Sequence, residues 1–111
     1  MNLKNYTSET PASRSIAHIE KRLVDIGALN VIKQYDYDKR LSGITFSIQY
    51  EGDTVMFRLP ANIEAIFQVM WKEVRRPKAT TEQRYRDQAE RTAWKIIADW
   101  VDVQASIVML K

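Results

Sequence analysis

Apolar residues between Thr80 and Leu110 recur every three or four positions, over a stretch that contains neither glycine nor proline. The spacing separates them into two parallel stripes. The first stripe consists of Tyr85, Ala89, Ala93, Ile96, Trp100, Val103, Ile107 and Leu110. The second stripe consists of Trp94, Ile97, Val101, Ala105 and Val108. Together they form an apolar face wider than one packing partner needs, so the pattern predicts a long helix that is buried on two sides.

A shorter stretch near the N-terminus has the same helical spacing. Its apolar positions are Ile16, Ile19, Leu23 and Ile26. Thr10 can cap a helix, Pro11 suits the first helical position, and Gly27 can end the helix in the left-handed conformation. We therefore predict a helix over residues 11–26. The polar residues 1–9 before it are predicted to be a flexible lead-in or an edge strand.

The pattern changes from helical to alternating after this helix. Residues 30–37 are rich in β-branched and aromatic side chains, and residues 38–43 have the composition of a turn. Apolar and polar side chains then alternate over residues 44–50 and again over residues 54–59. Three successive strands with short connections predict an antiparallel meander.

Helical spacing returns after Pro60. The apolar residues of this stretch are Ile63, Ile66, Phe67, Met70, Trp71 and Val74. Asn62 can cap this helix, and Thr80 or Thr81 can cap the long final helix. We predict a single α+β domain over residues 1–111, in which helices cover a three-stranded antiparallel meander in the order α-β-β-β-α-α.

The second stripe of the long helix bears on the oligomeric state. Two shorter helices suffice to cover one face of the sheet, and the final helix can pack on that layer with one stripe. A large exposed apolar patch is rare on a monomer. We therefore predict a homodimer, or a higher homo-oligomer, with an interface formed by Trp94, Ile97, Val101 and Val108. The alternative is a helix that runs through the middle of a monomer, with both stripes in the core.

Composition limits the available chemistry. The chain contains no cysteine, and its one histidine, His18, lies on the polar face of the first helix, where a surface role is expected. Its three glycines stand singly, so no phosphate-binding glycine loop is present. Asp99 and Asp102 could share a cation on the long helix, but a solvated polar face is favoured. We predict no enzyme, no cofactor and no metal site.

The sequence also predicts a cytoplasmic protein. The first eleven residues contain no apolar run, which argues against a signal peptide. The most apolar stretch, residues 96–110, carries two aspartates and is shorter than the ~20 residues that a membrane span needs. We therefore expect no membrane insertion.

Basic residues concentrate around the start of the long helix. The net charge is +3, but residues 72–95 contain eight basic and four acidic side chains. The bases predicted to bind DNA or RNA phosphates are Arg75, Arg76, Lys78, Arg84, Arg91 and Lys95. The alternative is that neighbouring carboxylates neutralise them. Arg58, on the polar sheet face, is either an anchor for an anionic ligand or a solvated strand residue.

Two segments carry a resemblance to a known family. Residues 57–62, FRLPAN, precede an aliphatic helix, and residues 89–105 read AERTAWKIIADWVDVQA. With the opening helix and residues 33–35, KQY, they resemble a family of small uncharacterised proteins encoded by bacteriophages and prophages. The resemblance covers nearly the whole chain. It implies a protein made in the cytoplasm of an infected bacterium, but it implies no activity and no functional residues.

These observations predict two functions. The first is a non-catalytic phage protein that binds nucleic acid through the basic face. The second is a protein-interaction or anti-defence module that inhibits a host protein through the Trp94 stripe or the sheet face, or sequesters a nucleotide signal. Salt dependence separates them, because binding to nucleic-acid phosphates weakens steeply as salt rises.

Overall fold

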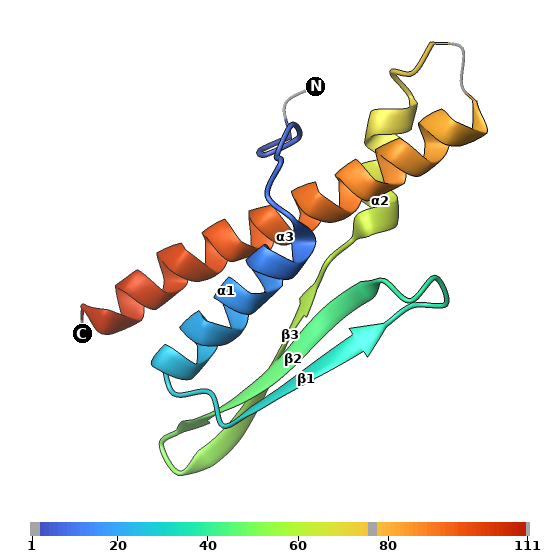
Figure 1. Ribbon diagram of the computed structural model, residues 1–111. Helices are drawn as coiled ribbons and strands as arrows, with labels where there is room; N and C mark the ends of the chain where they lie inside the picture. The colour runs from blue at the N-terminus through green and yellow to red at the C-terminus, as the bar shows by residue number, and fades with distance from the viewer. Residues whose placement is uncertain (1–2, 76–77, 111) are drawn as a thin grey trace.

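The computed structural model describes residues 3–75 and 78–110. Its elements are α1 (Ala12–Asp25), β1 (Asn30–Tyr35), β2 (Leu41–Tyr50), β3 (Asp53–Pro60), α2 (Ile63–Trp71) and α3 (Ala79–Met109). Figure 1 shows α1 beside α3, the sheet on one side of this pair, and α2 against the N-terminal half of α3. This arrangement confirms the predicted α+β fold and its element order.

The sheet is an antiparallel meander with β2 in the centre. Glu51 and Gly52 both have positive φ angles, 50° and 87°, as a tight two-residue hairpin turn requires. The register places Phe46 opposite Phe57, and their rings stack with centroids 5.4 Å apart. Because side chains alternate along a strand, this aromatic pair lies on the apolar face of the sheet, where Phe46 is buried and Phe57 is partly exposed.

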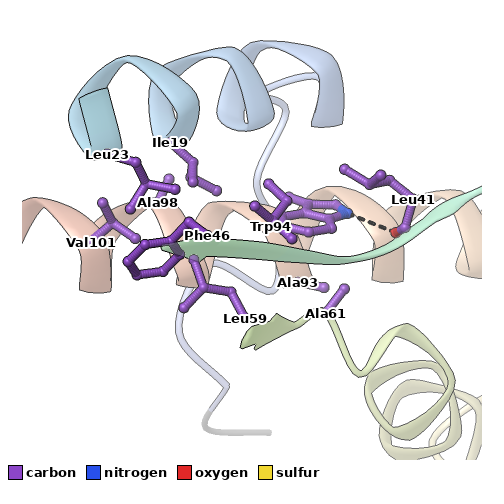
Figure 2. Close-up of a cluster of buried hydrophobic side chains, with 11 residues drawn as sticks. Ile19, Leu23, Leu41, Phe46, Leu59, Ala61, Ala93, Trp94, Ala98 and Val101 are labelled. Atoms are coloured by element: carbon purple, nitrogen blue, oxygen red, sulfur yellow. Dashed lines mark hydrogen bonds between the residues drawn. The ribbon is translucent and has the colours of Figure 1, made fainter. Parts of the chain in front are cut away.

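Trp94 lies at the centre of the core, where α3 meets α1 and β2 (Figure 2). Its side chain is fully buried, and its indole Nε1 donates a hydrogen bond to the backbone carbonyl of Leu41 at 3.2 Å. The rest of this cluster is Ile19, Leu23, Leu41, Ile44, Phe46, Leu59, Ala61, Ala93, Ala98 and Val101.

The helix ends differ in part from the predictions. Pro11 occupies the capping position of α1, which places Thr10 one residue too early to cap it. Lys78 occupies the same position of α3, so Thr80 and Thr81 both lie inside the helix. The predicted threonine caps are therefore wrong. A cap must directly precede the helix, and composition did not locate that boundary to the residue.

The predictions for Gly27 and Gly43 have opposite outcomes. Gly27 follows α1 with a φ of 99°, which confirms it as the left-handed helix stop. Gly43 lies inside β2 rather than in the predicted turn. A Cβ atom at Gly43 would lie 2.9 Å from the Arg58 guanidinium and 3.0 Å from the Gln34 side-chain oxygen. Gly43 therefore lies under the flexible ends of two side chains on the polar sheet face, and turn geometry does not explain it.

Residues 3–9 form no strand, so the edge-strand prediction is wrong. They cross the polar face of α3 instead and are fixed there by hydrogen bonds. Thr92 Oγ1 donates to the Asn5 carbonyl at 3.0 Å, and Gln88 Nε2 donates to the Ser8 carbonyl at 3.0 Å. Thr92 is fully buried as a result. A helix face that looked solvated in the sequence is thus covered by the chain's own N-terminal segment.

The molecule is elongated, with principal extents of 55, 29 and 19 Å. The 31 residues of α3 account for this shape, because a helix of that length spans about 46 Å. Among the helices in the described part of the chain, none combines the length and the apolar character that crossing a membrane would require.

Candidate interaction surface on the long helix

The second stripe of α3 is core, not interface. Trp94 is 0% exposed and Val101 is 2% exposed, and Ile97 packs against the same buried cluster. The prediction that these side chains face another copy is therefore wrong. Only Val108, near the end of the helix, is substantially exposed, at 45%. The stripe is enclosed because α3 lies alongside α1 over the sheet, and the second stripe points into the space between them.

The first stripe is covered in its N-terminal half by α2. Ala89 is fully buried against Phe67 and Met70 of α2. The Tyr85 ring meets the Trp71 ring edge-on, with centroids 6.0 Å apart. Because α2 has only 9 residues, this cover does not extend along the rest of the stripe.

The C-terminal half of the first stripe is open. Trp100 is 52% exposed, Val103 57% and Ile107 51%. We call the following row of residues the open seam: half-buried Ile96, then Trp100, Val103, Ile107 and Leu110. The excess apolar surface predicted for α3 is therefore present, but on the opposite stripe from the one predicted.

The carboxylate of Asp99, beside the open seam, is neutralised within the chain. It accepts a hydrogen bond from Asn5 at 2.9 Å and pairs with Lys4 at 3.0 Å and Lys95 at 3.2 Å. Partial burial acts to raise the pKa of Asp99, but Asn5 and the two lysines outweigh it and lower the pKa to about 2. Asp99 is therefore ionised and paired at neutral pH.

Asp102 points to the other side of α3, towards α1. Its Oδ1 lies 2.7 Å from His18 Nε2 and 3.2 Å from Arg22 Nε. His18 is thus a half-exposed surface residue with a structural partner. Asp99 and Asp102 face different elements and share no site. Within the described residues, no group of three or more potential ligands could hold a metal ion.

The predicted nucleic-acid-binding residues fall into two groups. Arg75, Lys78 and Arg84 are exposed around the connection between α2 and α3, and they make no ion pair with any other described residue. Arg91 donates hydrogen bonds to Ser8 and Gln88, and Lys95 pairs with Asp99. These two help to fix the N-terminal segment on α3. Arg76, also predicted, lies outside the described residues.

The acids of α3 pair partly with neighbouring bases of the same helix, as the sequence suggested, and partly with a base from another part of the chain. Arg40, from the connection between β1 and β2, reaches Asp87 at 2.8 Å and Glu90 at 3.1 Å. Its hydrogen bond is the main cause that lowers the pKa of Asp87. Arg86 pairs with Glu82 at 3.3 Å. No sequence signal could have identified Arg40, because it lies far from both partners along the chain.

Arg58 lies on the open, polar face of the sheet, as predicted. Its Nε donates to the side-chain oxygen of Gln34 at 3.2 Å, across the strand that contains Gly43. Its described partner is thus a neutral amide, which leaves the positive charge of Arg58 exposed to solvent.

A hollow of about 620 Å³ lies between the N-terminal segment and the start of α3. Arg84 and Arg91 line it, but so do Glu9 and Glu73. Among the described residues, its lining thus combines two cations and two anions. Its polar wall is already used to hold residues 3–9 in place, so the hollow is not a simple anion site.

Comparison with known proteins adds no further assignment. The chain matches no protein-family model, and neither a curated protein nor a solved structure shows significant similarity to it. The resemblance to phage-encoded proteins therefore stays a prediction.

Proposed function

We propose that this protein is a non-catalytic binding module that docks a helix of a partner protein along the open seam of α3. The observation that carries this proposal is the row formed by Trp100, Val103 and Ile107, each about half exposed. Contiguous apolar surface of this kind usually marks a protein interface, and tryptophan often dominates the binding energy there.

The spacing of the open seam supports a helix as the partner. Its residues, from Ile96 to Leu110, are separated by four, three, four and three positions. That alternation is the heptad pattern of a coiled-coil seam, in which side chains of one helix insert between those of another. An apolar helical face in a partner protein fits such a seam.

The resemblance to phage-encoded proteins suggests a setting for such a partner. A module of this kind, made in an infected cell, would act by occupying the helical surface of a bacterial protein, for example a defence component. Cytoplasmic location and inhibition of a host protein are parts of this proposal.

Trp100→Ala tests the docking surface, with Val24→Ala as the matched control because Val24 is 62% exposed on α1. Proteins captured from a bacterial lysate are purified, and their affinities for both variants are measured. We expect Trp100→Ala to weaken binding about 30-fold or more, as truncation of a tryptophan hot spot does, and Val24→Ala to leave binding unchanged. Equal affinities for the two variants would contradict the proposal.

A second candidate function is nucleic-acid binding, favoured by the exposed charges of Arg75, Lys78 and Arg84, which make no ion pair with another described residue. Fluorescence anisotropy with labelled DNA and RNA, measured over a range of salt concentrations, tests it. We expect affinity to fall steeply with salt. Replacing Arg75 and Arg84 by alanine should reduce the slope by about 1 for each phosphate that the variant no longer binds.

Lys21→Ala is the control for this measurement, because Lys21 is also an exposed base but lies on α1. Binding that is absent, or that Lys21→Ala weakens as much as the arginine changes do, would rule the second candidate out.

A further inference from the structure

We infer that the helix bound along the open seam is α3 of a second copy of this chain, running antiparallel and related by a two-fold axis. This inference rests on the proposed function and names its partner. Three features of the structure support it: the absence of charged side chains from the seam itself, the position of α2, and the sizes of the facing side chains.

The open seam is compatible with itself in charge. Between residues 96 and 110 the only charged side chains are Asp99 and Asp102. Asp99 is neutralised by Lys4 and Lys95, and Asp102 faces α1, so neither presents a free charge. Flanking charges normally select a particular partner or repel a like copy. The five residues of the open seam are themselves all apolar, so two copies can meet along it without placing like charges in the contact.

The position of α2 selects the antiparallel direction. Ala89 and Ala93 continue the spacing of the open seam towards the N-terminus, and α2 packs on Ala89. Two parallel α3 helices would bring both α2 helices to the same end and into the same space. In an antiparallel pair, the two α2 helices lie at opposite ends. The seam then pairs freely over residues 96–107 of each copy, or about 18 Å.

An antiparallel two-fold pairing also matches side-chain sizes. It can place Trp100 of one copy beside Val103 of the other, and Ile96 beside Ile107. The large Trp100 side chain then faces the smaller Val103, which is how well-packed layers interdigitate, and the two isoleucines match each other in size. A two-fold interface contains each contact twice, once in each direction, so every favourable contact of this register contributes twice.

Sedimentation velocity of the full chain across the micromolar range is the first test. We expect a reversible dimer, and we expect Val103→Glu to raise its dissociation constant about 100-fold or more, because two carboxylates then enter an apolar seam near each other. Val24→Glu, on α1, should leave the dimer unchanged. Circular dichroism checks that both variants fold.

Disulfide formation tests the direction of the pair, and it has no background because the chain contains no cysteine. Ile96→Cys mixed with Ile107→Cys should form a crosslinked dimer under mild oxidation, whereas either variant alone should form little. Efficient crosslinking of Ile96→Cys with itself would indicate a parallel pair and overturn the inference.

The two proposals fail in different ways. A wild-type chain that stays monomeric, or a dimer that Val103→Glu leaves intact, overturns the inference about a second copy. If Trp100→Ala still weakens binding to another protein in that case, the docking function stands with a different partner. If Trp100→Ala changes neither association, both proposals fall.

Discussion

Two tryptophans on α3 show how strongly position decides the role of a side chain. Trp94 and Trp100 lie six residues apart on one helix, and each belongs to a stripe with the same apolar character. Trp94 is fully enclosed and its indole nitrogen is hydrogen-bonded, whereas Trp100 is half exposed. The first should therefore contribute to folding and the second to binding.

Phenylalanine substitution of each tryptophan separates these roles. Trp94→Phe should lower the free energy of unfolding by about 2 kcal/mol, because it leaves a small cavity and an unpaired Leu41 carbonyl. Trp100→Phe should change it by less than about 0.5 kcal/mol when measured in solution dilute enough to dissociate the proposed dimer. Urea denaturation of both variants measures the difference, and a larger decrease for Trp100→Phe would contradict the assignment.

At the scale of elements, α3 organises the chain because each of its sides has a different neighbour. The sheet and α1 cover the second stripe, α2 covers the start of the first stripe, and residues 3–9 cover part of the polar face. The open seam is the part of α3 that these elements do not reach. Its exposure is a consequence of the short length of α2 and the path of the N-terminal segment.

The contact between the N-terminal segment and α3 should make stability depend on pH. The pKa of Asp99 is lowered from 3.8 to about 2 in the folded chain, so folding favours its ionised form. This contribution is present above the unfolded pKa and disappears as pH falls through the folded pKa. The shift corresponds to about 2 kcal/mol near neutral pH.

Asp99→Asn should therefore lower the free energy of unfolding near neutral pH, and the deficit should shrink as pH falls from about 4 to about 2. Urea denaturation of both proteins across this range measures it. Glu51→Gln, a change in the β2–β3 turn, is a matched control that should show no such convergence. A deficit independent of pH would show that Asp99 acts through shape rather than charge.

At the scale of the whole molecule, the proposed antiparallel dimer would separate the two basic ends of α3. The start of each α3 lies far from the seam, so the exposed bases of the two copies would be about 70 Å apart. A dimer therefore would not build one doubled basic surface. Nucleic-acid binding, if it occurs, would use two separate sites.

The sequence by itself determined the number, type and order of the elements, because helical and strand spacing are local and strong in this chain. It also determined that α3 carries more apolar surface than one partner covers. The same periodicity predicted the position of Arg58 on the polar sheet face and that of His18 on the helix surface. The structure agrees with both placements.

Only the tertiary structure decided which stripe of α3 is buried, because spacing defines the faces of a helix but not the direction from which its neighbours approach. Trp94 and Val101 became core through the placement of α1 and the sheet, and the seam at Trp100 stayed open because α2 is short. The pairing of Arg40 with Asp87 likewise depends on long-range packing. Such contacts join distant residues and leave no local trace in the sequence.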